Sequence, residues 1–265
     1  MRLFKRVVEL TVGETEITGL DIAFEIEKNL NQEPNSCHID IFNLGPKNRE
    51  ILSKYQRVPV LLKAGYQDSV GLIFKGDMIR CSHLKEGPTW KSSLVNGDGA
   101  NAIQSTRINK SFAKGTPVKT VIKEIAAQLG LPYSSAIKQC EGLDKNLERS
   151  FAASGNPMDE LGRILRHFGY STSVQNQALQ IIKQGEPLEQ QAISLSANSG
   201  LSATPELGSD KKLQIKSVLM PELLPGSMVH VDSAVFKGFA IIQAVRFDGS
   251  NFDDAWGAEM EAKVC

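Results

Sequence analysis

Alternating apolar and polar residues indicate that the first third of the chain is β-structure. The clearest run places apolar side chains at every second position, with charged residues between them: Leu20, Ile22, Phe24 and Ile26. Successive side chains of a strand point to opposite faces, so this period of two predicts a strand with one face on a core. Further strands are expected at 37–41, 58–64 and 70–80, and a short helix at 47–55. We therefore expect residues 1–95 to form a small β-barrel.

The pattern changes to a helical period in the middle of the chain. Two apolar stripes follow the 3.6-residue period, at 117–129 and 157–168. Thr116-Pro117 and Asn156-Pro157 each offer an N-cap followed by proline at the first helical position, and Gly130 and Gly169 end the two segments. Two short strands, 171–174 and 179–182, flank a polar turn at 175–177, whereas residues 134–150 show no clear pattern. Residues 96–185 are thus expected to form an α+β domain.

The last part of the chain, residues 186–265, returns to β-patterns. The expected strands are 213–219, 227–231, 239–247 and 258–264. A stretch rich in Ser, Ala, Asn and Gly, residues 194–208, indicates a linker before them. The predicted fold class is α+β, mainly β, with two similar small β-barrels flanking the middle α+β segment.

Composition and charge exclude several functional classes. The chain has 30 Lys and Arg and 30 Asp and Glu, and proteins that bind nucleic acid through phosphates usually carry a basic excess. No apolar run approaches the length of about 20 residues needed to span a bilayer, and residues 1–10 lack the apolar block of a signal peptide. The four cysteines are widely and unevenly spaced, which is typical of free thiols. We expect no membrane contact, no specific nucleic-acid binding and synthesis in the cytoplasm.

The strongest candidate for a metal site combines Cys37 and His38 with Cys81 and His83. Two Cys/His pairs could supply four zinc ligands. Neighbouring residues of a strand point to opposite faces, however, so Cys37 and His38 could share an ion only at a bend. A buried thiol and a histidine at the edge of a barrel are the favoured interpretation.

Other candidate motifs also lack the pattern that chemistry requires. The stretch 97–102, Gly-Asp-Gly-Ala-Asn-Ala, lacks the third glycine and the βαβ context of a dinucleotide loop. Asp159-Glu160 stabilises the first turn of a helix, and Asp253-Asp254 lies in a loop that could in principle bind a cation. His167 and His230 stand apart from the other histidines. We predict no catalytic, cofactor-binding or metal-binding residue, and no cofactor.

Several strings together resemble the central hub proteins of phage tails and baseplates. The first barrel carries Gly19-Leu-Asp-Ile-Ala-Phe-Glu-Ile-Glu-Lys28, then Ile39-Asp-Ile-Phe-Asn-Leu44 before the short helix. Val60-Leu-Leu-Lys-Ala-Gly-Tyr66 and Ile73-Phe-Lys-Gly-Asp77 resemble the following strands of that family. The Gly-Thr-Pro and Ser-Gly-Asn-Pro helix starts, Leu224-Pro-Gly226 and Phe247-Asp-Gly249 extend the likeness over most of the chain. The family is related to the hub part of type VI secretion spikes.

The resemblance implies a structural virion protein. Its expected state is a homotrimer on the tail axis, in which two barrels per subunit match a hexameric tail tube to a trimeric spike. The implied partners are the tail tube or distal tail protein above, a separate spike or tail-tip protein below because the sequence stops at Cys265, and the tape measure protein. The strand 3–10 and the linker 194–208 are the candidates for subunit contacts.

Two other functions compete with the hub. A tail-associated hydrolase would need a convergent set of acid, base and nucleophile, which the scattered histidines and ordinary carboxylates do not provide. A receptor- or carbohydrate-binding module of the tail tip would need exposed aromatic residues, and aromatics are only 6% of the chain and fall mostly on core positions. The hub is the first prediction, the binding module the second, and the protein is predicted not to be an enzyme.

Overall fold

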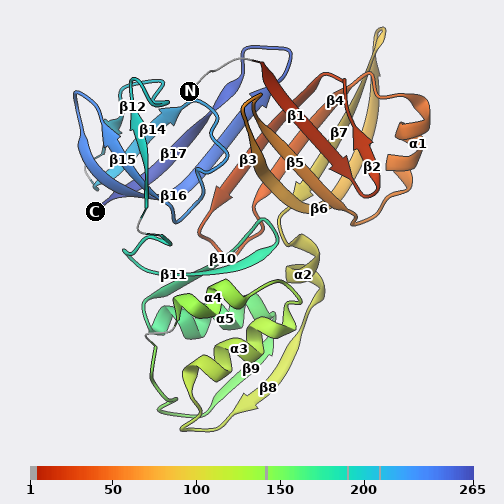
Figure 1. Cartoon of the computed structure of the whole chain (residues 1–265). Coiled ribbons are helices and arrows are strands. Elements are labelled where there is room, and N and C mark those ends of the chain that lie inside the picture. The colour runs from red at the N-terminus through yellow and green to blue at the C-terminus, as the bar shows by residue number, and fades with distance from the viewer. Residues whose placement is uncertain (1–4, 141–142, 190, 209) are drawn as a thin grey trace.

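Most of the chain folds into β-structure, with helices gathered in one lobe. The computed structural model describes residues 5–140, 143–189, 191–208 and 210–265. Within them the fold is α+β and mainly β, as the alternating pattern predicts. Figure 1 shows a broad sheet region above and a smaller lobe below.

The first part of the sheet region is built from seven strands and one short helix. Their bounds are β1 Arg6–Val12, β2 Thr15–Ile17, β3 Ile22–Asn29, β4 Ser36–Phe42, α1 Pro46–Lys54, β5 Pro59–Tyr66, β6 Ser69–Glu86 and β7 Thr89–Gly97. In β3 the predicted apolar positions are buried and the residues between them are exposed or half-buried. Lys28 occupies the next inward position of the same strand and is almost completely buried.

The chain returns to the sheet region after the lobe. The strands are β12 Ala192–Ser196, β13 Glu206–Leu207, β14 Lys212–Ser217, β15 Met228–Asp232, β16 Lys237–Ser250 and β17 Trp256–Val264. Gly226, at a φ of +93°, bonds to Ile242, and Leu188 bonds to Gly226, so this turn anchors the segment that leaves the lobe.

One long strand joins the two parts into a single sheet. The pairing order is β13-β14-β17-β16-β3-β4-β7-β6-β5-β1-β2, and β15 and β12 extend from β16. The first half of β16 pairs with β15 and its second half, from Ala244 to Ser250, pairs with β3. The register of β16 against β17 shifts between Ile242 and Ala244, where the strand changes neighbours. Among the described residues, the strand pairings follow an open order from β13 to β2.

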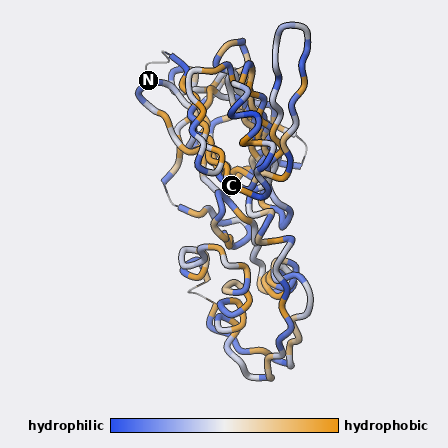
Figure 2. Tube along the Cα trace, turned by 90° about the vertical axis from the view of Figure 1, so that its right-hand side faces the viewer, coloured by the Kyte–Doolittle hydropathy of each residue, from blue (hydrophilic) through white to orange (hydrophobic). Residues whose placement is uncertain are grey.

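The lobe, residues 100–185, contains four of the five described helices and two separate two-stranded sheets, β8–β9 and the β10–β11 hairpin. Its elements are α2 Ala100–Ser105, β8 Ile108–Phe112, α3 Val118–Gln128, α4 Ser134–Gln139, β9 Phe151–Gly155, α5 Pro157–His167, β10 Tyr170–Gln175 and β11 Ala178–Lys183. The β10–β11 hairpin lies between the helices and the sheet (Figure 1). The side view in Figure 2 shows the lobe at the narrow lower end of an elongated chain.

Two apolar cores hold these parts. One core runs through both parts of the sheet region and includes Ile26, Phe74 and Phe247, all fully buried. The other lies inside the lobe and includes Ile125 and Leu161. No residue belongs to both clusters among those described, so each part has its own hydrophobic driving force.

The second predicted helix start is confirmed and the first is shifted. Asn156 caps α5 by accepting a hydrogen bond from the Met158 amide at 2.9 Å, with Pro157 at the first helical position. Such a cap stabilises a helix by about 1 kcal/mol. At α3, however, Pro117 takes the cap position, and the Thr116 hydroxyl donates to the Ala113 carbonyl instead. Thr116 is therefore not an N-cap, because its side chain closes the preceding turn.

The expected linker needs correction, and part of the expected first strand lies outside the described residues. The predicted linker 194–208 begins inside β12, which pairs in parallel with β15, and contains β13. The serines hid this strand, since only Leu195 within it is fully buried. Of the expected first strand, residues 3 and 4 lie outside the described residues, and β1 extends beyond it to Val12.

Candidate assembly surfaces and the junction between sheet and lobe

The residues weighed for a zinc site do not converge. Cys37 is buried while its neighbour His38 is exposed on the other face of β4. Burial raises the pKa of the Cys37 thiol. His83 instead faces Ser92, with 2.8 Å from Nδ1 to the hydroxyl, and lies 3.7 Å from the Cys81 sulfur. No group of three or more His, Cys, Asp or Glu suited to a metal ion occurs among the described residues.

The stretch 97–102 forms a structural turn at the top of the lobe. Gly99, at a φ of +66°, starts the short helix α2, and a Cβ there would lie 2.8 Å from a Val174 methyl carbon. Asp98 is completely buried. The glycines thus allow a close approach between this turn and the β10–β11 hairpin, which explains the motif without a nucleotide.

Asp98 binds the tip of the β10–β11 hairpin. Its carboxylate accepts hydrogen bonds from the Asn176 amide at 2.5 Å and the Gln177 amide at 2.6 Å. Both tip residues have positive φ, 53° and 60°, as a two-residue turn of type I′ requires. The two amides of such a turn point the same way and favour an anion. Asp98 therefore offsets the strain of a non-glycine turn and fixes the hairpin against the sheet region.

Lys28 and Asn35 complete this junction from the sheet side. The Lys28 ammonium donates to the Asn176 side-chain oxygen at 2.6 Å. The Asn35 amide donates to the Val174 carbonyl at 2.8 Å and to the Gln175 side-chain oxygen at 3.0 Å. In return, Gln175 donates to the Asn29 carbonyl at 2.7 Å. Buried polar groups that are mutually satisfied in this way specify one arrangement of two parts.

Burial shifts the pKa values of both charged groups of the junction, Asp98 and Lys28. It raises the pKa of Asp98 to about 6, against the opposing effects of Lys28, the Gln177 and Asn176 amides and Asn35. It lowers the pKa of Lys28 to about 8, although Asp98 partly offsets that shift. Both groups are therefore ionised together in the window between these two values.

The raised pKa of Asp98 predicts how stability depends on pH. Between pH 6 and 4 the folded chain binds a proton at Asp98 that the unfolded chain, with a usual pKa near 3.8, does not bind. The stability that this bound proton contributes is fully present below the pKa of the unfolded chain. It is lost as the pH rises through the folded pKa of about 6. Relative to Asp98→Asn, we expect the wild type to gain up to about 3 kcal/mol as the pH falls from 7 to below 4.

Urea denaturation of both chains across this range measures the effect. Lys28 stays protonated below pH 6, so it contributes no slope of its own there. The raised pKa would be contradicted if the difference in unfolding free energy between the two chains stayed constant with pH. It would also be contradicted if the wild type lost stability relative to Asp98→Asn on acidification.

The remaining candidate carboxylates and histidines are dispersed. Glu160 forms an ion pair with Arg163, and Asp159 lies beside it in the first turn of α5. In the loop 251–255, Asp253 accepts from the Ala255 amide and its carbonyl accepts from Arg6. His167 and His230 each lie against a phenylalanine ring, in the lobe and in β15 respectively.

Sequence reasoning missed the residues that tie the molecule together. The sequence shows Asp98 only within a false nucleotide motif, and Lys28 only as the last residue of the string 19–28 that resembles the hub family. The sequence does contain one signal for Lys28. This residue follows Ile22, Phe24 and Ile26 at the same spacing of two residues, so its side chain points to the buried face of β3, where a lysine needs partners.

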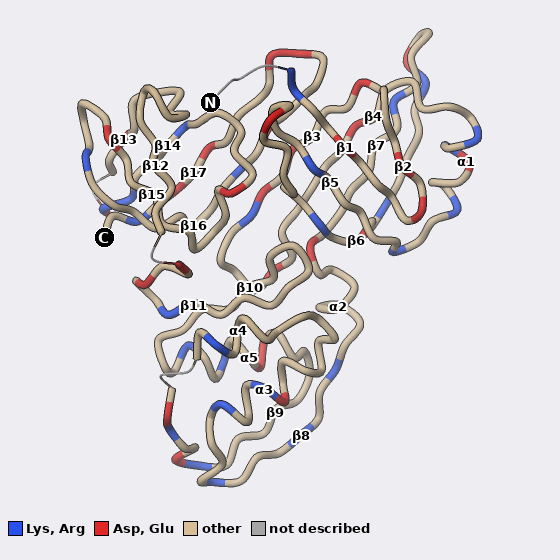
Figure 3. Tube along the Cα trace, in the orientation of Figure 1, with Lys and Arg blue, Asp and Glu red and all other residues tan. Residues whose placement is uncertain are grey.

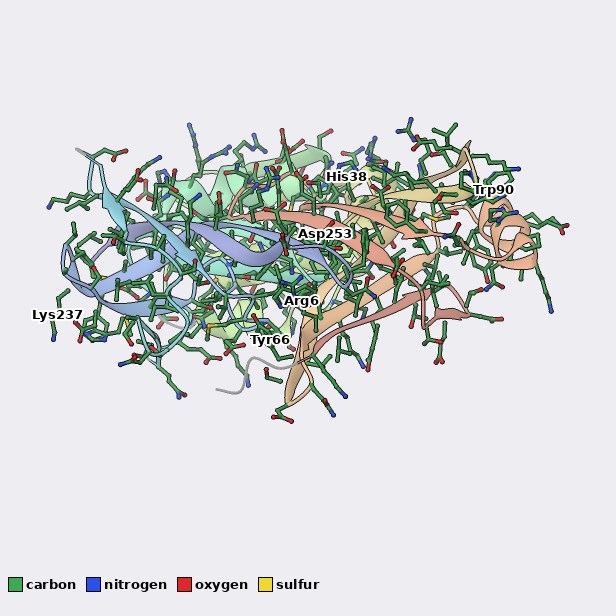
Figure 4. All side chains as sticks on the ribbon, turned by 90° about the horizontal axis from the view of Figure 1, so that it is seen from above. Arg6, His38, Tyr66, Trp90, Lys237 and Asp253 are labelled. Carbon is green, nitrogen blue, oxygen red and sulfur yellow. The ribbon has the colours of Figure 1, made fainter. Side chains whose placement is uncertain are left out.

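The sheet region presents two different ends. At one end the β6–β7 hairpin extends past its neighbour, because β5 pairs with β6 only up to Asp77. Leu84 on this extension is exposed, and Trp90 there lies beneath the guanidinium of Arg49, 4.0 Å from the ring centre. In Figure 4 Trp90 marks this end, while Arg6, Tyr66 and Asp253 lie near the middle.

The opposite end carries exposed apolar residues of another kind. Val235 and Phe239 flank Lys237 at the β15–β16 turn and are 62% and 48% exposed. Lys237 marks this end in Figure 4. Next to it, β12 pairs only with β15, so its other edge is free among the described residues. Free edges and exposed apolar side chains are features that proteins use for subunit contacts.

Solved structures of similar fold come from tails and secretion machines. A tail protein from Neisseria meningitidis MC58 matches with a TM-score of 0.68 at 14% identity, covering 98% of this chain and 97% of the other. A 43 kDa tail protein of prophage MuSo2 from Shewanella oneidensis matches with a TM-score of 0.70 at 9% identity, covering 97% and 98%. An E. coli component of the type VI secretion system, described as structurally similar to T4 tail proteins gp27 and gp5, matches with a TM-score of 0.64 at 11% identity, covering 97% and 76%.

Sequence comparison gives a family rather than an individual relative. No curated protein matches the chain. None of the described helices is long and apolar enough to cross a bilayer. The family model described as baseplate hub gp41 matches residues 4–258, nearly the whole chain. The chain therefore belongs to the baseplate hub gp41 family and is a structural, hub-like component of the phage tail.

Proposed function

We propose that the protein is a homotrimeric hub that matches a hexameric tail tube to a trimeric spike. The observation that carries this proposal is the pair of unlike ends of the sheet region. A contact between two different patches is heterologous, and it closes into a ring when the rotation between copies allows. The hairpin end with Leu84 and the turn end with Phe239 would meet between neighbouring copies.

Each copy would contribute two similar tube-like units to the ring. In this proposal residues 1–95 and 186–265 are the two small barrels, and residues 96–185 are the middle domain. Three copies then present six units to a six-fold tail tube or distal tail protein above. Below, a separate spike or tail-tip protein and, within the channel, the tape measure protein are the other proposed partners. The site of action is the virion, after synthesis in the host cytoplasm.

The ring has a specific test in mixed variants. Leu84→Asp disables one end and Phe239→Asp the other, so each variant alone should be a monomer by native mass spectrometry at a concentration where the wild type is a trimer. An equimolar mixture of the two should give a dimer, because one intact pair of ends remains. Phe252→Asp, an exposed phenylalanine between the ends, is the matched control and should leave the trimer intact.

Other outcomes would reject the ring. A monomeric wild type at every concentration would contradict self-assembly. A wild-type dimer that either single variant retains would indicate a two-fold contact instead.

A receptor- or carbohydrate-binding module is the weaker proposal. Such sites usually need clustered aromatic side chains at the surface. Among the described residues the exposed large aromatics are Phe239 and Phe252, which lie on different loops and strands. An enzymatic role has no support from the dispersed titratable residues described above.

A further inference from the structure

Charge is distributed unevenly between the parts of the chain. Residues 100–185, the lobe, contain 11 Lys and Arg against six Asp and Glu, for a net charge of +5. Residues 186–265 contain six against 11, for a net charge of −5, and residues 1–99 are neutral. The balanced total therefore hides a basic lobe attached to an acidic C-terminal part. Figure 3 shows the Lys and Arg positions along the lobe.

Three carboxylates of the lobe are already engaged in ion pairs. Glu124 pairs with Lys110, Asp144 with Lys119 and Glu160 with Arg163. Several exposed cations have no carboxylate within 4 Å among the described residues: Lys114, Lys123, Lys138, Lys145, Arg149 and Arg166. Among the described residues, these six cations are therefore not neutralised by ion pairs.

Four of these cations lie on neighbouring segments of the lobe. The segment around Lys114 lies beside the segment 145–149, because Gly115 donates to the Leu147 carbonyl and Leu147 donates to the Thr116 carbonyl. Lys145 lies 5.7 Å from the centre of the Phe168 ring, at the C-terminus of α5, where Arg166 is also exposed. We call Lys114, Lys145, Arg149 and Arg166 the basic end.

The opposite side of the molecule carries the reverse charge. Asp253 and Asp254 are exposed in the loop after β16, and Asn251 of the same loop bonds to Ile22 and Leu20, beside the exposed Asp21. This loop lies at the end of β3 that is remote from the lobe, since the other end of β3, Asn29, contacts Gln175. This acidic loop, in which Arg6 also donates to the Ser250 and Asp253 carbonyls, thus lies at the opposite end of the chain from the basic lobe.

We propose that the basic end docks on a protein face that presents clustered carboxylates. The inference rests on the proposed hub, because it assigns to the lobe the neighbour below the ring. Charge complementarity of this kind orients a partner and speeds its association. A protein is favoured over nucleic acid because Glu148 and Asp144 lie among the cations and four charges are fewer than the about 6–10 phosphate contacts of a typical DNA-binding surface.

The test uses the full chain and three probes: poly-L-glutamate, a DNA duplex of similar total charge, and vesicles of anionic lipid. The triple variant Lys114→Glu, Arg149→Glu and Arg166→Glu reverses the basic end and spares Lys145, which packs on Phe168. The matched control reverses three exposed lysines of the sheet region that lie outside the β6–β7 extension: Lys47, Lys54 and Lys75. At low salt we expect about a tenfold or greater loss of poly-L-glutamate affinity in the first variant and little change in the control.

Each other outcome rejects the inference. An equal loss in the control, or no binding by the wild type, would mean that the basic end is not a docking surface. Binding of DNA or vesicles through the same residues, as tightly as poly-L-glutamate, would assign the surface to a different partner. Native mass spectrometry of the same samples tests the ring separately. A trimer that does not bind poly-L-glutamate would reject only this inference. A chain that binds poly-L-glutamate but never forms a ring would reject only the proposed hub.

Discussion

Replacing Asp98 by alanine is expected to lower the free energy of unfolding by about 3–5 kcal/mol at pH 7. The substitution leaves the Asn176 and Gln177 amides without their acceptor and leaves Lys28 buried without a negative charge nearby. Unpaired buried groups of this kind lose their desolvation energy without compensation. Denaturation with urea, followed by circular dichroism, measures the change.

A double-mutant cycle separates the charge from the hydrogen bonds. Lys28→Met should also destabilise the chain, because it removes the cation that stabilises the buried Asp98 carboxylate. Together, Lys28→Met and Asp98→Ala should cost less than the sum of the two single changes, since no unpaired charge remains. An additive cycle would show that the two groups do not interact across the junction.

A surface ion pair provides the control for this cycle. Asp144→Ala removes an exposed partner of Lys119 and should change stability by no more than about 1 kcal/mol. If Asp98→Ala had an equally small effect, the buried junction would not hold the lobe against the sheet.

The local elements were predictable because their signals are local. The alternation in β3, the Asn156-Pro157 start of α5 and the polar turn of the β10–β11 hairpin each depend on residues next to one another. The same holds for the fold class, which follows from the proportions of the two periods. The confirmed hub family likewise follows from short strings spread along the chain.

The joins between elements were not predictable, because they depend on residues far apart in the sequence. Asp98 and Asn176 are 78 positions apart and Lys28 and Asn176 148 apart, and no periodicity links them. The passage of β16 from β15 to β3 depends on a register shift near Gln243 that has no turn residue to mark it. The unlike ends of the sheet follow only from the pairing order, which also shows that β12 overlaps the start of the expected linker.

This pairing order leads to a second large effect. Phe247→Ala should cost about 3–5 kcal/mol, because Phe247 is fully buried on β16, where that strand pairs with both β3 and β17. Since one apolar core runs through both parts of the sheet region, the loss should weaken both parts together. Hydrogen exchange should show faster opening in residues 6–97 and 192–264, and retained protection in the lobe core.

Leu161→Ala gives the reciprocal measurement. Leu161 is fully buried in the lobe core, so its loss should cost about 2–5 kcal/mol and should speed exchange in α3, α5 and β10 before the sheet. If Phe247→Ala instead weakened residues 192–264 and left residues 6–97 protected, the two β parts would be separate cooperative units. A ring of three copies would then rest on six independently stable units, whereas the shared core predicts three, because the hydrogen bonds of β16 to β3 and the packing of Phe247 couple the halves of each copy.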